Sequence, residues 1–584
     1  MTTTNTKNKS FNFAQLQRVL RYAKPYKYKF YVAIALAITI AIVTPIRPVL
    51  VQRTIDVYIQ NNWAKALIYI TIIQIFILVL ETVIRFYFTY ITNWLGQHVI
   101  KDIRIEVYNK VLQLNLRQYD QTPIGTLTTR TINDIEAINE IFADGIIPIL
   151  ADLLSIIVVV GVMFSYHWQL TVAALLPFPI IIIATYYFKE SVNKSFIKVR
   201  NAIANLNSFV QEHIGGMQVV QSFAAENKEY KKFKLINAQH RNANIQAIFA
   251  YSVFFPIVEI ILALSISLMV WKGAAIPVSG GVIVAFLLLL NLIFRPLRVI
   301  ADKFNVIQMG MVASERVFKL LDNTDVTHTG TGEETNVRLQ GSVQFDNVCF
   351  SYTPQIPVLT NISFTINKGE TIAIVGSTGS GKTTIVNLLN KMYSIQSGTI
   401  AIDDKNIEAY HINDLRKNIG VVLQDIFLFG DTIHNNLTLW DSTIQSHTVE
   451  AACKLIGIHN FIMQLPNGYQ YNVMERGATL SVGQRQLLSF ARALLYNPSI
   501  LVLDEATSSV DTESEQLIQH AINTLIKNRT SIIIAHRLST IQKATKIIVL
   551  DHGEIKEMGT HAELLQLNGW YSKLYNSTNA IIKA

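Results

Sequence analysis

The segment from Gly376 to Thr384, GSTGSGKTT, has the residue types and the spacing that bind a triphosphate. It follows an apolar run, Thr371 to Val375, and opens a helical run, which is the context that such a loop needs. Its glycines let backbone N–H groups and the helix N-terminus face phosphates, Lys382 adds positive charge at the β- and γ-phosphates, and Thr383 suits Mg²⁺. The expected ATP contacts are Gly376, Ser377, Thr378, Gly379, Ser380, Gly381, Lys382, Thr383 and Thr384.

Two carboxylates follow the apolar run Ile500 to Leu503. They would lie at the C-terminal edge of a sheet, where ligands bind in α/β folds. Asp504 would hold Mg²⁺ directly or through water, and Glu505 would act as general base or position the water that attacks the γ-phosphate. Taken alone, an acidic pair at a strand end could instead cap the next helix.

The segment LSVGQ, Leu480 to Gln484, precedes the helical run that ends at Leu495. The hydroxyl of Ser481 and the first amides of that helix would form a second terminus that attracts anions. Alone this would be an ordinary helix cap. The candidate residues here are Ser481, Val482, Gly483 and Gln484.

The elements around these segments predict an α/β domain over residues 341–584. Strand-like runs such as SVQFDNVCFSY, TIAIVG, ILVLDEA and TSIIIAH alternate with helical segments, which is typical of a largely parallel sheet. The preceding stretch, 321–340, is polar and rich in Thr and is expected to be a linker.

The first half of the chain is too apolar for a soluble protein: half of the 584 residues are hydrophobic, and the mean hydropathy is +0.30. Its apolar stretches can each cross a hydrocarbon core of about 30 Å. We therefore predict a multidomain membrane protein, with a six-helix all-α transmembrane domain over 30–320 followed by the α/β P-loop domain. The spans are expected at about 30–57, 65–93, 141–166, 170–188, 247–271 and 279–304.

Two long polar excursions, 94–140 and 189–246, separate spans two and three and spans four and five. They are rich in Lys and Arg, so the positive-inside rule places them on the cytosolic side. Helical periodicity on both sides of each turn-like tip predicts helices that extend out of the membrane. We expect the tips, near Gln118 to Thr122 and Ser208 to Gly215, to dock on the α/β domains.

Residues 1–29 are predicted to be a cytosolic amphipathic segment, because basic residues flank the apolar side chains of FNFAQLQRVLRYAKPY. The alternative is a merely solvated basic leader. The net charge of +9 does not require nucleic acid, because much of it flanks the spans. Cys349 and Cys453 are expected to be reduced structural thiols.

The order of P-loop, LSVGQ and ILVLDE resembles the ATPase domain of ABC transporters, and residues 11–580 resemble an ABC exporter half-transporter of the multidrug and lipid-flippase type. The resemblance implies that two such ATPase domains close over two ATP molecules, each held between one P-loop and the opposite signature. It further implies that Tyr352 stacks on adenine, that Gln424 contacts Mg²⁺ and the attacking water, and that His536 contacts the γ-phosphate. It also implies roles for Glu475 to Gly477, before the signature, and for Ser508 to Asp511, which would contact the opposite subunit.

One residue departs from the family pattern. The usual signature is LSGGQ, and Val482 replaces the first glycine. Valine is stiff and disfavours positive φ, so either this position does not need the freedom of glycine or the site is weakened. Such LSxGQ forms also occur in subunits that pair with a different partner, so a homodimer and a heterodimer both remain open.

Charged residues within the spans are candidates for a substrate cavity, because each is costly in lipid unless it is paired or faces water. Glu81 and Arg85, at i and i+4, could simply neutralise each other. Glu259 has no basic neighbour along its helix, so it is the first candidate for a group that would favour cationic amphiphiles, with an ion pair to another span as the alternative. The candidate cavity residues are Glu259, Asp152, Arg85 and Arg295.

These expectations describe an exporter of a hydrophobic or amphipathic solute in the cytoplasmic membrane, driven by ATP and Mg²⁺. A lipid flippase shares every motif. An ATP-gated channel or regulatory membrane protein is the alternative from another class, and Glu505 and His536 argue against it because gating needs binding more than turnover. Six spans exclude a soluble DNA-acting ATPase with similar motifs.

Overall fold

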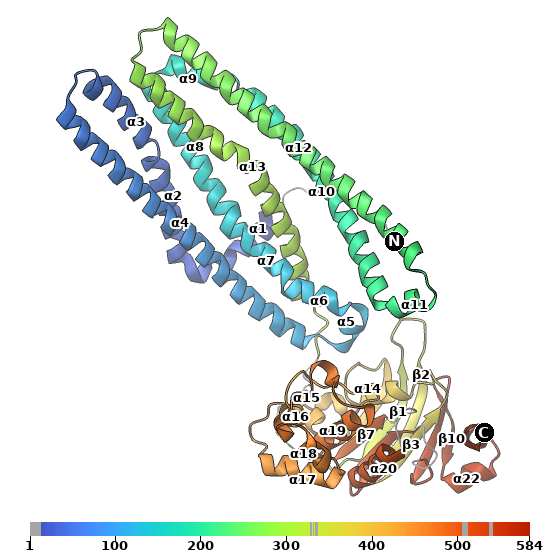
Figure 1. Ribbon diagram of the computed structural model, residues 1–584. Helices are drawn as coiled ribbons and strands as arrows, with labels where there is room; N and C mark the ends of the chain where they lie inside the picture. Colours follow the sequence, from blue (N-terminus) through green and yellow to red (C-terminus); the bar gives the residue numbers. More distant parts are fainter. Residues whose placement is uncertain are drawn as a thin grey trace. The chain divides into compact units, whose positions relative to one another are not determined.

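The computed structural model describes residues 13–327, 330, 332, 337–504, 512–535 and 541–583, which form two compact units. The first, the helical unit, comprises the chain up to Leu112 and the range Ile124–Asn323. The second, the sheet unit, comprises the chain from Thr324 onward together with the short insertion Gln113–Pro123. Figure 1 follows the chain from blue at its N-terminus to red at its C-terminus.

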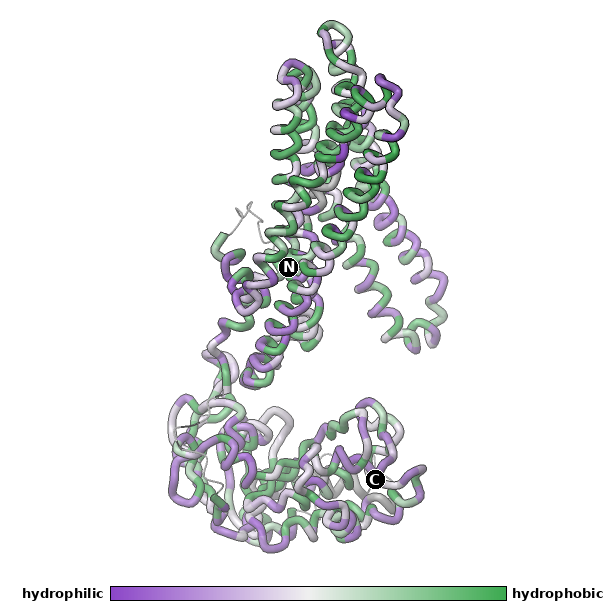
Figure 2. The backbone as a smooth tube through the Cα atoms, turned by 90° about the vertical axis from the view of Figure 1, so that its left-hand side faces the viewer, coloured by the Kyte–Doolittle hydropathy of each residue, from purple (hydrophilic) through white to green (hydrophobic). Residues whose placement is uncertain are grey.

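The helical unit contains long apolar helices, as the composition predicts. Within the described residues, six helical stretches are long and apolar enough to cross a membrane, and Figure 2 shows their hydrophobic residues in green. This confirms the predicted six-span architecture. The stretches are Lys24–Ile59, Ala64–Gln113, Ile124–Tyr166, Trp168–Gly215, Glu226–Ala275 and Gly280–Leu297. The helices that build them are α2 (Lys27–Val43), α3 (Ile46–Arg53), the π-helix η2 (Thr54–Ile59), α4 (Ala64–Gln113), α8 (Ile146–Tyr166), α9 (Trp168–Leu175), α10 (Phe178–Gly215), α12 (Glu226–Ala275) and α13 (Gly280–Leu321).

Helices α4 and α12 have 50 residues each, about 75 Å at 1.5 Å per residue, and so extend far beyond a bilayer core. Two short helices form the tips of the excursions: α5 (Leu116–Gln121) after α4, and α11 (Met217–Ser222) between α10 and α12. The expected second tip, Ser208 to Gly215, is the last part of α10, since neither glycine nor proline interrupts the helix there before the pair Gly215 and Gly216. The return from the first tip runs through α6 (Ile124–Thr131), α7 (Asn133–Glu140) and the π-helix η3 (Ile141–Gly145).

A carboxylate holds the start of α13 against the end of the first span. Asp56 accepts hydrogen bonds from the Ser279 hydroxyl at 2.5 Å and from the Gly281 backbone N–H at 2.9 Å. It thereby satisfies orphan donors at a helix N-terminus, where negative charge is favourable. A Cβ atom at Gly281 would lie 2.5 Å from the Asp56 carboxylate, so glycine is required here.

The N-terminal segment packs on protein rather than lying free. Helix α1 (Phe13–Arg21) buries Leu16 and Val19, as an amphipathic helix should, and the 3₁₀ turn η1 (Lys24–Tyr26) leads into α2. Arg18 forms two hydrogen bonds, of 2.6 and 2.8 Å, with Asp322 just after α13, and its guanidinium lies 4.2 Å from the ring centre of Phe318. The end of α13 is thus tied to the N-terminal helix.

The sheet unit is an α/β fold, as predicted. In its described part, one sheet has the order β10-β9-β3-β8-β7-β6, in which β9, β3, β8, β7 and β6 are mutually parallel and β10 is antiparallel. A second, antiparallel sheet has the order β2-β1-β4-β5. The strands are β1 (Val343–Phe350), β2 (Leu359–Ile366), β3 (Thr371–Gly376), β4 (Ser397–Ile402), β5 (Lys405–Asn406), β6 (Ile419–Val422), β7 (Ile500–Asp504), β8 (Thr530–Ile534), β9 (Lys546–Asp551) and β10 (Glu554–Gly559).

Helices cover the larger sheet, and its apolar strands are buried on both faces. They include α14 (Lys382–Leu389), α15 (Ile412–Asn418), α16 (Ile433–Thr438), α17 (Ser446–Ile456), α18 (His459–Gln464), α19 (Val482–Leu495), α20 (Thr512–Ile526), α22 (His561–Gln566) and α23 (Trp570–Lys583). The parallel strands β3, β8, β7 and β6 are neighbours in that order, so their carboxyl ends share one edge. Every motif identified from the sequence, apart from Tyr352, Glu475 to Gly477 and LSVGQ, follows one of these four strands in the chain.

Candidate functional site

The loop between β3 and α14 depends on its glycines. Gly376 and Gly381 have φ values of +156° and +101°, in the region that L side chains rarely adopt. A Cβ atom would lie 2.1 Å from the Leu550 carbonyl oxygen at the first position and 2.6 Å from Leu359 Cδ2 at the second. No other residue fits, so the loop can wrap closely around a group at the N-terminus of α14.

Lys382, the first residue of α14, lies in that loop. Its ammonium group donates hydrogen bonds to the carbonyl oxygens of Gly376, at 3.0 Å, and Ser377, at 2.8 Å. Burial lowers its pKa, while the nearby Asp504 carboxylate opposes this change. Thr383 follows with an exposed side chain. The lysine charge is therefore held at the helix start, where an anionic ligand would offset the cost of burying it.

The strand order brings the other expected residues to the same edge. Asp504 is the last residue of β7, and its side chain is buried. The residue before it, Leu503, pairs with Val422 at the end of the adjacent strand β6. Gln424 is exposed two residues beyond β6. One carboxylate with neutral oxygen donors such as Thr383 and Gln424 suits Mg²⁺, which keeps several of its waters. The described residues contain no cluster of three or more His, Cys, Asp or Glu side chains that could hold a metal by themselves.

Three expected positions lie outside the described residues: Glu505, His536 and the range 508–511. Glu505 directly follows Asp504 at the end of β7, and His536 follows Ala535 just after β8. Their roles stay predictions.

Tyr352 lies beside the start of α14. Its hydroxyl is 3.2 Å from the Thr384 hydroxyl, and its side chain is partly exposed. The ring contacts Phe350 and Tyr393 edge-on, with ring centres 4.9 and 5.0 Å away. The sequence reading missed Tyr393, because a tyrosine after the P-loop helix carries no signal until its neighbours are known. A flat aromatic ring near the phosphate loop can stack on a base.

The LSVGQ segment forms a regular helix start. Ser481 is the N-cap of α19: its hydroxyl accepts from the Gln484 N–H at 3.3 Å, and the Gln484 side chain accepts from the Ser481 N–H at 2.9 Å. Val482 is the first helical residue and is exposed, and Gly483 is buried. A first helical position needs negative φ, so valine fits there without backbone strain, and its effect on ATP binding stays a prediction.

The charged residues of the spans differ in their partners. Arg85 forms an ion pair of 3.1 Å with Glu81, which is the neutralisation considered as the alternative. Asp152 pairs with Lys303 of α13 at 2.5 Å. Glu259 and Arg295 lie on exposed faces of α12 and α13.

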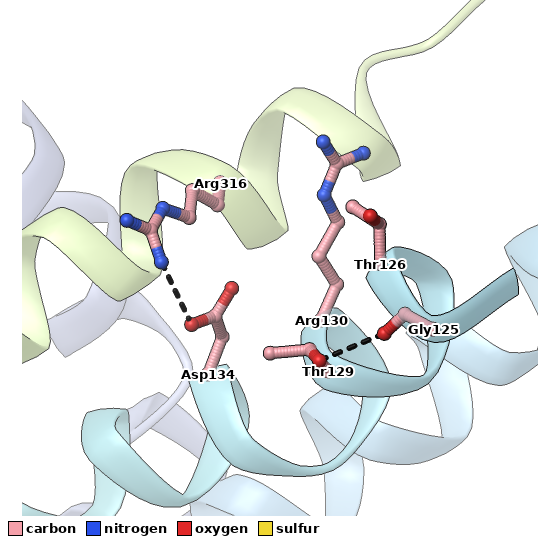
Figure 3. A pocket seen from close by; sticks show the side chains of 6 residues that line it. All are labelled: Gly125, Thr126, Thr129, Arg130, Asp134 and Arg316. Carbon is pink, nitrogen blue, oxygen red and sulfur yellow. Dashed lines mark hydrogen bonds and ion pairs between the residues drawn. The ribbon is translucent and has the colours of Figure 1, made fainter. Parts of the chain in front are cut away.

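The helical unit also contains an open polar cleft of about 340 Å³, lined by Gly125, Thr126, Thr129, Arg130, Asp134 and Arg316 (Figure 3). Arg316 of α13 pairs with Asp134 of α7 at 3.4 Å, and Thr129 donates to the Gly125 carbonyl at 2.7 Å. None of these residues belongs to the sheet unit, so this cleft is separate from the phosphate-facing loop.

The chain joins a P-loop on a parallel sheet to six membrane-spanning helices. This combination defines a class of membrane proteins in which nucleotide binding acts on the membrane-spanning helices. Two family models match the chain: the ABC transporter transmembrane region over residues 30–297, and the ABC transporter family over residues 359–508. The chain belongs to the ABC transporter family.

Three relatives match nearly the whole chain. An ABC transporter ATP-binding protein of Streptococcus pneumoniae, provisionally so named, is 34% identical over 97% of this chain and 98% of its own length. An uncharacterized ABC transporter ATP-binding protein of Bacillus subtilis is 37% identical over 97% of this chain and 95% of its own. A Staphylococcus aureus protein with the provisional name multidrug export ATP-binding/permease protein is 36% identical over 97% and 100%. This chain is thus a multi-pass membrane protein with the build of an ABC exporter half-transporter, and a transport ATPase.

Proposed function

We propose that this protein uses ATP hydrolysis to export, or to flip between leaflets, a hydrophobic or amphipathic solute across the cytoplasmic membrane. The observation that carries the proposal is the shared edge of β3, β7 and β6, where the glycine loop, Lys382, Asp504 and Gln424 lie at neighbouring strand ends. The same edge is followed in the chain by Glu505 and His536. The ATPase domain and the N-terminus would be cytosolic, on the side of the Lys- and Arg-rich excursions.

The residues at this edge would have separate roles in ATP binding and hydrolysis. The loop amides and Lys382 would bind the phosphates, Tyr352 would stack on adenine, and Glu505 would take the proton from the attacking water or orient it. Thr383, Asp504 and Gln424 would hold Mg²⁺, which supplies charge neutralisation between the β- and γ-phosphates. His536 would contact the γ-phosphate as its charge develops.

A dimer would complete the site, because each chain carries one loop and one signature helix. The N-terminus of α19, with Ser481 capping it and Val482 exposed, is suited to the ATP of an opposite subunit. ATP would then bind the closed dimer best and shift an equilibrium between inward- and outward-open states. A homodimer is our first proposal, and a heterodimer with a related half-transporter is the alternative.

The solute is proposed only by class. The provisional name of the Staphylococcus aureus relative refers to multidrug export. A lipid is the nearest alternative, since it would use the same cavity from the side of the bilayer. An ATP-gated channel is the less favoured alternative, because the chain keeps both Glu505 and His536.

The test is the ATPase activity of the purified protein alone in nanodiscs, beside the Glu505→Gln variant, with candidate lipids and cationic drugs added. We expect basal turnover, stimulation by some of these solutes, and a loss of about 100-fold or more in the variant. Turnover that appears only after a second half-transporter is added would establish the heterodimer. Equal turnover of the parent and Glu505→Gln would overturn the catalytic assignment.

A further inference from the structure

The sheet unit includes one piece of the first excursion, and this piece reaches the aromatic residues beside the phosphate loop. Residues Gln113–Pro123, with α5 at their centre, belong to the sheet unit. Leu114 forms a β-bridge with Val326, and Gln118 donates to Asp325 at 2.7 Å. Helix α5 is therefore fixed on the sheet unit by contacts at its start, before the turn that carries Asp120.

Asp120 accepts a hydrogen bond from the hydroxyl of Tyr393, and the Tyr393 ring is partly buried. Burial and the Asp120 carboxylate together raise the pKa of Tyr393, so its hydroxyl stays a donor throughout the physiological range. The bond to Asp120 holds the hydroxyl end of the ring in place, and because a phenol O–H prefers the plane of its ring, it favours the ring orientation that keeps the carboxylate near that plane.

The ring of Tyr393 in turn fixes Tyr352. The two rings meet edge-to-face at 5.0 Å and 87°, and Phe350 supports both from β1, with ring centres 4.9 and 5.7 Å away. The Thr384 hydroxyl holds the far end of Tyr352 at the start of α14. Edge-to-face contacts are directional, so a turned Tyr393 ring would leave the orientation of Tyr352 to its two remaining contacts and loosen it.

We propose that Asp120 is a positioning residue for ATP: through Tyr393 it holds the Tyr352 ring in the plane that stacks on the base. The proposal deepens, and rests on, the proposed ATP binding by this chain. Because Asp120 follows the 50-residue helix α4, a movement of that helix would alter the orientation of Tyr352 and hence the affinity for ATP. Asp120 lies in the first tip that the sequence singled out, whereas Tyr393 belongs to none of the sequence motifs.

Steady-state kinetics of the full chain in nanodiscs test this. Tyr393→Phe keeps the ring and removes only its hydroxyl. We expect it to raise the KM for ATP about three- to tenfold, the range that one aromatic contact spans, with kcat within twofold. Asp120→Ala should match it. The exposed carboxylate competes with water, which keeps the effect at the low end. Tyr410→Phe, which removes a tyrosine hydroxyl bonded elsewhere in the sheet unit, at 2.9 Å to the Ile402 carbonyl, is the matched control and should leave KM unchanged.

A double-mutant cycle separates this proposal from the one it rests on. In a Tyr352→Ala background, Tyr393→Phe should add no further rise in KM, because the ring it positions is gone. If Tyr352→Ala raises the KM for ATP but Tyr393→Phe does not, the positioning role is wrong and base stacking stands. If Tyr352→Ala leaves the KM for ATP unchanged, the stacking role and the positioning role both fail. If kcat falls in Tyr393→Phe with KM unchanged, Asp120 acts on structure or coupling and not on the base.

Discussion

The two excursion tips, α5 and α11, have six residues each, but they belong to different units of the structure. Helix α5 is part of the sheet unit, where Leu114 is buried and Asp120 bonds Tyr393. Helix α11 belongs to the helical unit, and four apolar side chains in and beside it are exposed. The exposed fractions are 67% for Ile214, 41% for Met217, 61% for Val219 and 80% for Phe223.

The sheet unit carries a matching apolar surface near Gln424. Phe427, Phe429, Trp440 and Met474 are between 43% and 57% exposed, with Phe429 stacked edge-on against its two aromatic neighbours. Exposed apolar patches of this kind mark interaction sites. In the proposed dimer, this apolar surface would receive α11 of the second chain.

The largest expected effect comes from charging the second tip. Phe223→Asp should lower solute-stimulated ATP turnover about tenfold or more, because a buried carboxylate in an apolar contact removes a central anchor. The matched control is Leu235→Asp, at an exposed position of α12 outside the tip, which should stay within twofold of the parent. Equal loss in both variants would mean that charge anywhere on this hairpin is harmful and that α11 has no special contact.

A cross-link shows which chain receives each tip. With Cys349 and Cys453 replaced, the pair Phe223→Cys and Met474→Cys should oxidise to a product of dimer mass on a denaturing gel. ATP should change its yield, since the two chains move relative to each other in the proposed cycle. A product of monomer mass would place α11 on its own chain and remove the difference between the tips.

The smallest expected effect is a pH dependence that belongs to the second tip alone. His213 lies between two acceptors, the Phe209 carbonyl at 2.8 Å from Nδ1 and the Glu229 carboxylate at 2.9 Å from Nε2. Only the charged imidazolium donates to both, and the Glu229 bond, followed by the Phe209 bond, raises the pKa of His213. Stability from this pair is therefore complete below about pH 6.5, the unfolded value, and is lost as pH rises through the higher folded pKa.

Hydrogen exchange measures that change. Amides of residues 209–229 should exchange several-fold faster at pH 8.5 than at pH 6, after correction for intrinsic rates, while residues 113–123 should show no such trend. The His213→Gln variant should abolish the dependence. A persistent trend in that variant would assign the titration to another group.

The sequence alone established the class of both halves of the molecule. Membrane spans can be predicted from the sequence because a run of about 20 apolar residues is not stable in water. The P-loop can be predicted because Gly376 and Gly381 adopt positive φ values that other residues rarely adopt. The strand order is harder to predict from the sequence, but the apolar runs that end at Asp504 and at Gly376 already predicted that these residues lie at one ligand-binding edge of the sheet.

Only the tertiary structure decided which side chains lie next to these motifs. Asp120 and Tyr393 are 273 residues apart, and no sequence pattern links them. For Arg85 and Glu81 the sequence allowed either a cavity-facing position or an ion pair, and the structure shows the ion pair. The position of the second tip and the place of Val482 as the first residue of a helix also could not be predicted without the helix boundaries, which depend on packing and caps. Backbone requirements are local and leave a signature in the sequence, whereas contacts between distant segments depend on how the whole chain packs.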